Sequence, residues 1–590
     1  MNMPNSFGKN LNDLKKLFFE KPLQFEPVSA SFWGLREYDP QLRIEDDQLR
    51  EEERKFYAEL IANLEEFRNK SLPSNDRIDV EIMYKSALWN LRELEKPHPM
   101  DWRTSADISD LVDVVHSILM REPKDQESWE AILTRMQKIP SVILQRQKNL
   151  TIGFTGKFPF YRREVLDEGI ELIDEVSGYF EKDVQSFLVR LLPKEKAKQF
   201  KNEIEKAAIE IRKALQEYSS YLRATVLPLS TDDSYAIGEE EYVWRLKNLL
   251  FIDETPESLL NYGKKKVEET HQEMQKLAKE IWYNQSKGSN DYSKLLAELQ
   301  KQAPKSDSEM VEMYRNTVKS CVEFVQKHRL FQLPGNYDIR ILETPAAYRN
   351  VLSVAAMIPI PPFLDGVPAQ FWVTPTGNAK QPLGKPELLQ LNHSKWAAKN
   401  LVVHEAVPGH DLQLGASARQ FIQDGRKDLS YLVRQKTPDV MFSLGVEGWA
   451  HYAEHLMAEQ GFLTPEEKLF QLKDTQWRNV RIVVDIGIHT RKMAFNEAVD
   501  YFNEKTLAGK VTSEREIYRY SKFPLQAITY HLGKRDILTL KDEARKVTEK
   551  TFSLSQFHEL LLSYHGIPVS LFRQDFISRL QNEKQRKGGF

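Results

Sequence analysis

The stretch Leu401–His410, LVVHEAVPGH, joins an apolar lead-in to a His-Glu pair and then to a second histidine after Pro-Gly. Two imidazoles and a carboxylate are what a hydrolytic zinc site requires, because imidazole nitrogens bind the metal and a carboxylate can deprotonate its water. The usual H-E-x-x-H motif puts both histidines on one helix face. His404 and His410 are instead six residues apart. On a straight helix this spacing is about 600° of rotation, so the two side chains would point apart.

Pro408 and Gly409 offer a way to bring the two histidines together. Pro408 cannot donate a backbone hydrogen bond to the carbonyl of residue 404, and its ring pushes that carbonyl away. Gly409 tolerates whatever backbone conformation follows. The pair can therefore form a π-bulge or a loop that returns His410 to the face of His404. We predict one Zn²⁺ bound by His404 and His410, with Glu405 as general base. The alternative is that these are ordinary polar residues of a helix.

A zinc ion with two histidines needs a third protein ligand and an open position for water. Glu447 and Glu454 lie seven residues apart in a later helical segment, so their carboxylates share one face. We favour Glu447 as the ligand because it lies in the first turn after Gly445, and Glu454 as the residue that orients a ligand histidine. His451 is the alternative third ligand.

The segment 476–494 is apolar on nearly every side, yet Arg478, Arg481, Asp485 and His489 follow one another along it at helical steps. Charges on a buried helix must be paired or line a polar cavity. They form either an internal salt-bridge network or a substrate-binding wall. In the second case Arg481 or Arg478 binds a substrate carboxylate, and His489, oriented by Asp485, stabilises an oxyanion. Tyr530 is a second candidate for the oxyanion, or else a core aromatic residue.

Composition excludes several classes of protein. The chain has 590 residues, of which 41% are hydrophobic and 29% charged, and its net charge of −3 argues against nucleic-acid binding. The single cysteine, Cys321, excludes an internal disulfide. The first ten residues contain no apolar signal core or lipobox, and no window is apolar enough to span a membrane. We therefore expect a cytoplasmic protein without a membrane partner.

The organisation of the chain is mainly α-helical. Residues 1–330 read as an all-helical N-terminal half, and residues 331–590 as a catalytic half that belongs to the same integrated fold. Residues 337–343 and 369–374 have β-like patterns and predict a small antiparallel sheet or hairpin before the helix of His404. Thr464–Glu467 is a capping box that opens a helix, and Ser513 and Glu516 have the spacing of a second one.

Four motifs in this order resemble the bacterial "domain of unknown function 885" family, and the resemblance covers nearly the whole chain. The motifs are His404–Gln413 (HEAVPGHDLQ), Glu447–Glu454 (EGWAHYAE), Arg481–His489 (RIVVDIGIH) and Gln526–Lys534 (QAITYHLGK). Members of that family look like distant relatives of helical gluzincin peptidases such as thimet oligopeptidase and angiotensin-converting enzyme. The resemblance implies a helical, two-lobed fold around a deep cleft and a zinc peptidase activity. In the family motif the position of His451 is usually apolar, which also favours Glu447.

We therefore expect a zinc-dependent peptidase that acts on oligopeptides. Zn²⁺ and Glu405 would activate water, Tyr530 or His489 would share the oxyanion, and an extended peptide could pair with the strand at residues 370–374. Two alternatives stay open. The same site would serve a metal-dependent hydrolase or tailoring enzyme for non-peptide amides, or the chain is a catalytically silent helical binding protein.

Overall fold

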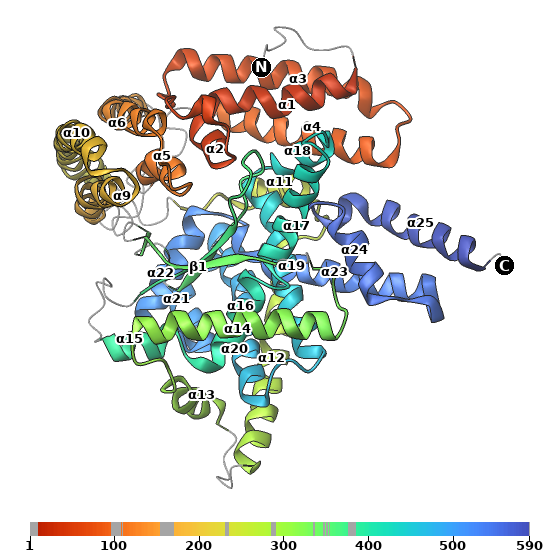
Figure 1. Ribbon diagram of the computed structural model, residues 1–590. Helices are drawn as coiled ribbons and strands as arrows, with labels where there is room; N and C mark the ends of the chain where they lie inside the picture. The colour runs from red at the N-terminus through yellow and green to blue at the C-terminus, as the bar shows by residue number, and fades with distance from the viewer. Residues whose placement is uncertain are drawn as a thin grey trace. The chain divides into compact units, whose positions relative to one another are not determined.

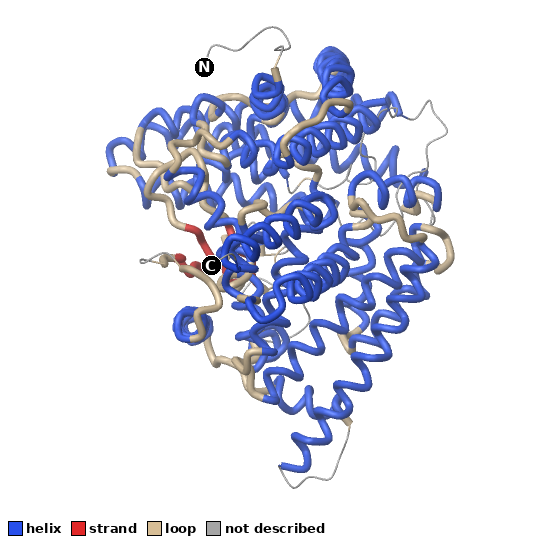
Figure 2. Tube along the Cα trace, turned by 90° about the vertical axis from the view of Figure 1, so that its right-hand side faces the viewer, coloured by secondary structure: helices blue, strands red, loops and turns tan. Residues whose placement is uncertain are grey.

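The computed structural model describes residues 10–95, 108, 110–153, 170–229, 235–284, 291–333, 337–345, 348–349, 352, 354–375 and 385–588. Within these residues helices form nearly all of the regular structure, and strands are confined to one small sheet (Figure 2). The predicted mainly α fold class is confirmed. Among the described residues, none of the helices combines the length and the apolar character needed to cross a bilayer.

The chain forms two compact units, each assembled from separate segments. Unit 1 comprises residues 1–235, 361–367 and 424–436, and unit 2 comprises residues 236–360, 368–423 and 437–590. The main boundary therefore lies near residue 235, whereas the sequence pattern suggests a division at residue 330, where β-like patterns begin. The physical reason is packing: helix α12 (Pro256–Asn284) lies along helix α20 (Pro465–His489), so the helices after residue 235 belong with the C-terminal ones.

Unit 1 is entirely helical in its described residues. Its longest elements pack in pairs, α3 with α4 and α6 with α10. Its α-helices are α1 (Leu11–Phe25), α2 (Pro27–Phe32), α3 (Asp47–Arg68), α4 (Ser74–Glu95), α5 (Asp110–Leu119), α6 (Gln126–Gly153), α8 (Ile173–Gly178), α9 (Val184–Leu191), α10 (Lys194–Tyr221) and α18 (Leu429–Gln435).

Unit 2 holds the sheet and every motif singled out in the sequence. In Figure 1, helix α14 lies beside α16 and strand β1. Besides α12 and α20, its elements are α11 (Glu239–Leu249), α13 (Tyr292–Gln300), α14 (Asp307–Lys327), β1 (Ile339–Glu343), β2 (Ala355–Ile358), β3 (Ala369–Val373), α15 (Lys385–Asn392), α16 (Lys395–Glu405), α17 (His410–Gln423), α19 (Asp439–Glu459), α21 (Phe495–Thr506), α22 (Lys510–Lys522), α23 (Gln526–Thr548), α24 (Leu554–Leu562) and α25 (Val569–Gly588).

The sheet has the strand order β1-β3-β2 and is mixed. Strand β2 runs antiparallel to β3, with Met357 opposite Phe371, whereas β1 runs parallel to β3, with Ile341 opposite Phe371. The predicted antiparallel pairing of residues 337–343 with 369–374 is therefore wrong. The segment between them contributes β2, and β2 takes the antiparallel position on the other side of β3. The chain crosses over before β3 begins, which leaves β1 and β3 parallel.

Helix α20 is the centre of the core of unit 2. It begins at the predicted capping box. The side chain of Thr464 accepts from the backbone N–H of Glu467, and the side chain of Glu467 accepts from the backbone N–H of Thr464. Every residue from Asn479 to His489 is buried, which confirms the predicted burial on all sides of this part of the helix. Ile482 and Ile486 pack in one apolar cluster with residues of α11, α12, α19 and α23. A helix buried in this way holds its polar side chains at fixed positions.

Candidate metal centre

Helix α16 ends at Glu405, and α17 begins at His410 after a turn formed by residues 406–409. The imidazole rings of His404 and His410 lie with their centroids 4.7 Å apart and their planes at 83°. The six-residue spacing is therefore accommodated by a break between two helices, not by a π-bulge within one helix. This break lets both rings face the same point.

The sequence of the turn explains the break. The Val407–Pro408 peptide bond is cis, and Pro408 has no N–H to continue the helix. A Cβ atom at Gly409 would lie 1.8 Å from the carbonyl oxygen of His404 and 2.3 Å from that of Val403. The turn therefore folds back onto the last turn of α16 so closely that only glycine fits there.

The side chain of Trp449 fixes the turn from the neighbouring helix α19. Its indole Nε1–H donates to the carbonyl oxygens of Pro408, at 2.9 Å, and Gly409, at 3.1 Å. Trp449 is completely buried. The carbonyl oxygen of Gly409 also accepts from the backbone N–H of Gln413 at 3.1 Å. The indole therefore adds a second donor to Gly409 and gives the carbonyl of Pro408, in the break between the helices, a donor from α19. The same helix α19 carries Glu447.

Glycines bring α19 close to its neighbours. A Cβ atom at Gly448 would lie 2.5 Å from the Cα atom of Gly533 in α23, and one at Gly445 would lie 1.6 Å from the carbonyl oxygen of Gly566. Backbone therefore packs directly against backbone where α19 and α23 cross. The crossing places Glu447 of α19 and Tyr530 of α23 beside the two histidines.

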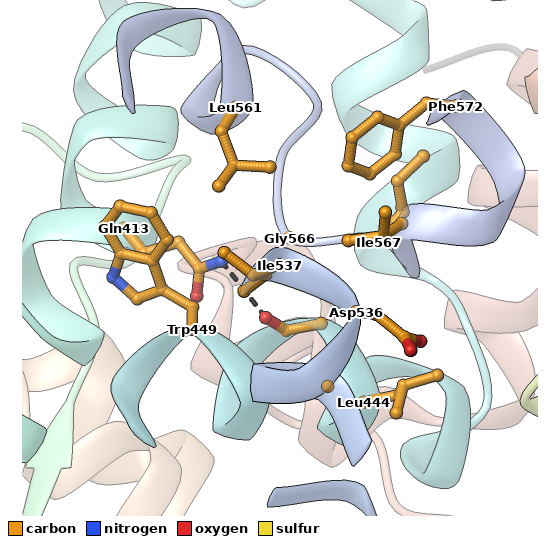
Figure 3. A pocket seen from close by; sticks show the side chains of 12 residues that line it. Gln413, Leu444, Trp449, Asp536, Ile537, Leu561, Gly566, Ile567 and Phe572 are labelled. Atoms are coloured by element: carbon orange, nitrogen blue, oxygen red, sulfur yellow. Dashed lines mark hydrogen bonds between the residues drawn. The ribbon is translucent and has the colours of Figure 1, made fainter. Parts of the chain in front are cut away.

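A small pocket lies behind Trp449 (Figure 3). In it the side chain of Gln413 in α17 donates to the carbonyl oxygen of Gly445 in α19, at 3.3 Å. Its other walls are mostly apolar, including Leu561, Ile567 and Phe572. None of the predicted catalytic or ligand residues lines this pocket, so it contributes to the support of the site and is not the candidate active site.

Three side chains converge as a possible metal cage. The ligand atoms of His404, His410 and Glu447 all lie within 4.8 Å of one another. Glu447 Oε2 lies 3.3 Å from His404 Nε2 and 3.4 Å from His410 Nε2. It is buried and yet makes no regular hydrogen bond in the described part of the chain. These spacings match the edges, about 3.3–3.4 Å, of a ligand tetrahedron with zinc bonds of about 2.0–2.1 Å.

Glu454 contacts the Nδ1 side of His404, opposite the nitrogen that faces Glu447. His404 Nδ1 lies 2.7 Å from Glu454 Oε1, to which Arg478 Nη2 also donates at 3.1 Å, and Asn400 donates to Oε2 at 3.2 Å. A neutral His404 that donates its Nδ1–H to Glu454 has an Nε2 lone pair, and this lone pair faces the carboxylate of Glu447. A cation between the two groups would remove the repulsion, which is the usual arrangement of a metal-binding histidine.

Electrostatics describe the same arrangement. Burial lowers the pKa of His404, but the carboxylates of Glu447 and Glu454 outweigh it and raise this pKa to about 10. Burial raises the pKa of Glu447, but the positive charges of His410 and His404 hold it well below its usual range. The side chains of His404, His410 and Glu447 therefore stabilise one another only when a positive charge lies among them.

His451 does not join the three converging residues. Its Nδ1 lies 3.3 Å from Glu454 Oε2, and its ring centroid lies 6.0 Å from that of His531. It therefore lies on the far side of Glu454 from His404. The structure does not support the alternative in which His451 is the third ligand.

Glu405 lies at the end of α16 and reaches the sheet. Its Oε2 accepts a hydrogen bond from the backbone N–H of Met357 in β2, at 3.0 Å. The N–H of Thr374 donates to the carbonyl oxygen of Val354. In an antiparallel pair the backbone groups of alternate residues point toward the partner strand. The backbone N–H and C=O groups of Ala355 and Met357 therefore point away from β3. Among the described strands, β2 has no strand on this side, and this edge lies against Glu405. Strand β3 lies between β1 and β2 and offers no edge, so the predicted pairing of a peptide with residues 370–374 is wrong.

Tyr530 lies against the histidines. Its ring is stacked on that of His404, with centroids 6.3 Å apart and planes at 13°. Its hydroxyl accepts from Gln526 Nε2 at 3.3 Å. The guanidinium of Arg481 lies 4.5 Å from the ring centroid. Burial, together with the charge of Glu447, raises the pKa of Tyr530, so the hydroxyl keeps its proton and can donate it in a hydrogen bond.

The four charged residues of α20 do not all reach the site. Arg478 contacts Glu454, and Arg481 lies on Tyr530. His489 instead lies 3.0 Å, through Nε2, from the carbonyl oxygen of Tyr520, and Asp485 binds Tyr242 and the backbone of Leu525. His489 is eleven residues beyond Arg478, about 16 Å along a helix. The structure therefore does not support an oxyanion role for His489 or a supporting role for Asp485.

Two residues near Tyr530 were not among the predicted site residues. Arg519 and Glu516 of α22 form ion pairs there, with Arg519 Nη2 3.1 Å and Arg481 Nη2 3.2 Å from Glu516 Oε2. The spacing of Ser513 and Glu516 predicts a capping box, but α22 already begins at Lys510 after Gly509. The capping interpretation is therefore wrong, and nothing local in the sequence indicates that Glu516 points toward α20.

Comparisons with known proteins agree with this architecture. A family model described as "Bacterial protein of unknown function (DUF885)" matches residues 27–575. No curated protein matches the chain. A solved structure titled as a "putative lipoprotein" from Colwellia psychrerythraea is similar with a TM-score of 0.81 and 19% identity, covering 97% of this chain and 99% of its own. A "putative lipoprotein of unknown function" from Shewanella oneidensis has a TM-score of 0.73 and 22% identity, covering 96% and 99%. These two likenesses show the shared fold.

Proposed function

The chain belongs to the bacterial DUF885 family of unknown function, and we propose that it is a zinc-dependent peptidase that hydrolyses oligopeptides. The observation that carries the proposal is the convergence of His404, His410 and Glu447, with the carboxylate of Glu405 next to His404 in the chain and held by the backbone N–H of Met357. Three N/O ligands with an adjacent general base are the arrangement of a catalytic zinc site, in which the fourth position is kept for water. The proposed likeness to helical gluzincin peptidases rests on the same arrangement.

His404, His410 and Glu447 would hold the ion, and Glu454 would orient His404. The donor set fits zinc, because two imidazoles and one carboxylate with edges of 3.3 and 3.4 Å match its preferred ligands and geometry. Bound zinc would act as a Lewis acid that polarises the scissile carbonyl and makes its water ligand more acidic.

The residues of this chain supply the remaining chemistry. Glu405 takes the proton of the attacking water and passes it to the leaving amine, which is the role of a general base that becomes a general acid. The hydroxyl of Tyr530, beside His404, donates a hydrogen bond to the oxygen on which negative charge develops. Arg478 donates a hydrogen bond to the carboxylate of Glu454. It therefore supports the site, and Arg481 is the better candidate for contact with substrate.

Strand β2 provides a place for the peptide backbone. Its edge away from β3 faces Glu405, because Met357 N–H on that edge donates to the Glu405 carboxylate. An extended peptide that pairs with this edge would gain main-chain hydrogen bonds without reading its sequence. The peptide bond to be cleaved would then lie next to Glu405.

Two other functions would use the same fold. A metal-dependent hydrolase or tailoring enzyme for non-peptide amides would need the same ligands and base, and a substrate screen separates it from a peptidase. A catalytically silent helical binding protein needs neither a metal nor Glu405. The cytoplasmic location expected from the sequence stays a prediction, and two similar solved structures are described as a "putative lipoprotein".

Metal analysis and one variant test the proposal. We expect one zinc per chain in the purified protein and hydrolysis of a mixed-sequence peptide library, detected by mass spectrometry. Glu405→Gln should keep zinc and lose about 10²–10⁴-fold in rate. Glu387→Gln, at an exposed position of α15, is the matched control and should change neither. Absence of metal in the wild type, or full activity of Glu405→Gln, would refute the proposal.

A further inference from the structure

Two arginines share one carboxylate next to the candidate metal centre. Arg481 donates through Nη2 to Glu516 Oε2 at 3.2 Å and through Nε to the hydroxyl of Tyr520 at 2.8 Å. Arg519 donates through Nη2 to the same Glu516 oxygen at 3.1 Å. Tyr520 and Trp477 also donate to this oxygen. We call Arg481, Arg519, Glu516 and Tyr520 the arginine cluster.

The arginine cluster carries one more positive than negative charge. Among the described residues, Glu516 is the carboxylate that forms an ion pair with Arg481 and Arg519. Nη1 of Arg481 has no hydrogen-bond partner in the described part of the chain, and the side chain of Arg519 is 35% exposed. A buried guanidinium that shares its counter-ion is a site where an anionic ligand gains from charge-assisted, bidentate hydrogen bonds.

The cluster is joined to the metal centre through two side chains. The guanidinium of Arg481 lies over the ring of Tyr530, which is stacked on His404. Gln526 accepts from Arg519 Nη1 at 3.3 Å and donates to the Tyr530 hydroxyl at 3.3 Å. One aromatic ring therefore separates the guanidinium of Arg481 from a ligand histidine.

We propose that Arg481 and Arg519 bind the free C-terminal carboxylate of the peptide substrate. This inference rests on the proposed peptidase function and makes the protein an exopeptidase that removes a short C-terminal fragment. The ring centroids of His404 and Tyr530 are 6.3 Å apart, and the guanidinium of Arg481 lies 4.5 Å from the centroid of Tyr530. An extended chain rises at most about 3.3–3.6 Å per residue. These two steps place the guanidinium at most about 11 Å from the His404 ring. The span therefore fits about three extended residues or fewer between the cleaved bond and the carboxylate.

A purely structural role for the cluster makes a different prediction. If Arg481 and Arg519 only hold α20 and α22 together, their loss lowers stability without changing the preference for a peptide carboxylate over a carboxamide. Selection of a carboxylate over a carboxamide is therefore the property to measure. Arg519 is the better residue to change, because it is partly exposed whereas Arg481 is buried.

The first experiment measures binding and does not depend on turnover. The zinc-loaded Glu405→Gln protein is titrated with mixed-sequence hexapeptides that end either in a carboxylate or in a carboxamide. We expect the free acids to bind about 10- to 100-fold more tightly, and this preference to disappear in Glu405→Gln/Arg519→Gln. Arg515→Gln, at an exposed position of the same helix α22, is the matched control and should keep the preference.

The second experiment follows cleavage by the wild type. Release of about three or fewer C-terminal residues from free acids, with amides cleaved at least ~10-fold more slowly, supports the inference. Equal cleavage of acids and amides, or equal binding of both in the titration, overturns it and leaves the peptidase proposal intact. Failure to cleave either series refutes the peptidase proposal, and the titration still decides whether the arginine cluster selects carboxylates.

Discussion

The indole of Trp449 donates to the carbonyl oxygens of Pro408 and Gly409, on the turn that separates His404 from His410. One side chain from α19 therefore fixes the relative position of two residues on α16 and α17. Since Glu447 lies two residues before Trp449, the third proposed ligand and the support of the other two come from the same helical turn.

We predict that Trp449→Phe weakens zinc binding about 10- to 100-fold, the range seen for residues that support metal ligands. The phenyl ring keeps most of the packing but cannot donate to the turn. The measurement is zinc affinity by competition with a chelator. Trp129→Phe is the matched control, because Trp129 is a buried tryptophan of unit 1 whose indole donates to the carbonyl of Pro123. Equal affinities for both variants and the wild type would contradict this account of the turn.

Glu454→Gln should also weaken zinc binding about 10- to 100-fold while leaving the three ligands in place. Glutamine can still contact His404 but removes the negative charge that makes its imidazole a better donor to the metal. Removing this charge also leaves Arg478 without its buried partner. Glu459→Gln, in the last turn of the same helix, serves as the control. Retention of full affinity in Glu454→Gln would exclude the orienting role.

Gly448→Ala should lower the free energy of unfolding by about 1–3 kcal/mol, because its methyl group would meet the backbone of Gly533 where two helices cross. Gly178→Ala has no atom within 4 Å of the added methyl group and should gain about 0.5–1 kcal/mol from its helical position. Urea denaturation of both variants measures the difference. A neutral Gly448→Ala would mean that the crossing can open without cost.

Stability should fall with rising pH through the titration of Asp485. Burial raises the pKa of this carboxyl to about 7, although the hydrogen bonds from Tyr242 and the backbone of Leu525 oppose the shift. The unfolded chain loses this proton near the ordinary value of about 3.9. Between these two pH values the folded protein holds a proton that the unfolded chain has lost, so this contribution to stability decreases as pH rises.

Asp485→Asn removes that titration. The free energy of unfolding of the variant, measured in urea from pH 4.5 to 8, should therefore fall less steeply than that of the wild type. Asp542→Asn, at an exposed position of α23, should follow the wild type. Parallel curves for Asp485→Asn and the wild type would show that Asp485 is ionised in the folded protein throughout this range.

Local chemistry made part of this structure predictable. The capping box at Thr464 and the break at Pro408 each depend on residues within a few positions of one another. The convergence of His404 and His410 follows from the same local rules, since proline stops a helix and glycine permits a tight return.

Contacts between distant segments were not predictable in the same way. Nothing in the sequence around Trp449 indicates that its indole reaches a turn forty residues earlier. Arg519 and Glu516 lie on a highly charged helix whose pattern suits a solvent-exposed face, so their approach to Arg481 depends on how α22 packs on α20. The parallel pairing of β1 with β3 likewise depends on where the chain crosses over, which strand patterns alone do not determine.

The contact between Gly448 and Gly533 has a consequence for how this family can diverge. Because main chain touches main chain there, neither position can accept a side chain and be rescued by repacking of its neighbours. A lineage that changes His404, His410 and Glu405 must still retain both glycines to keep these helices together. Sequences with the glycine pair and without the histidines would then share this architecture without the proposed metal ligands.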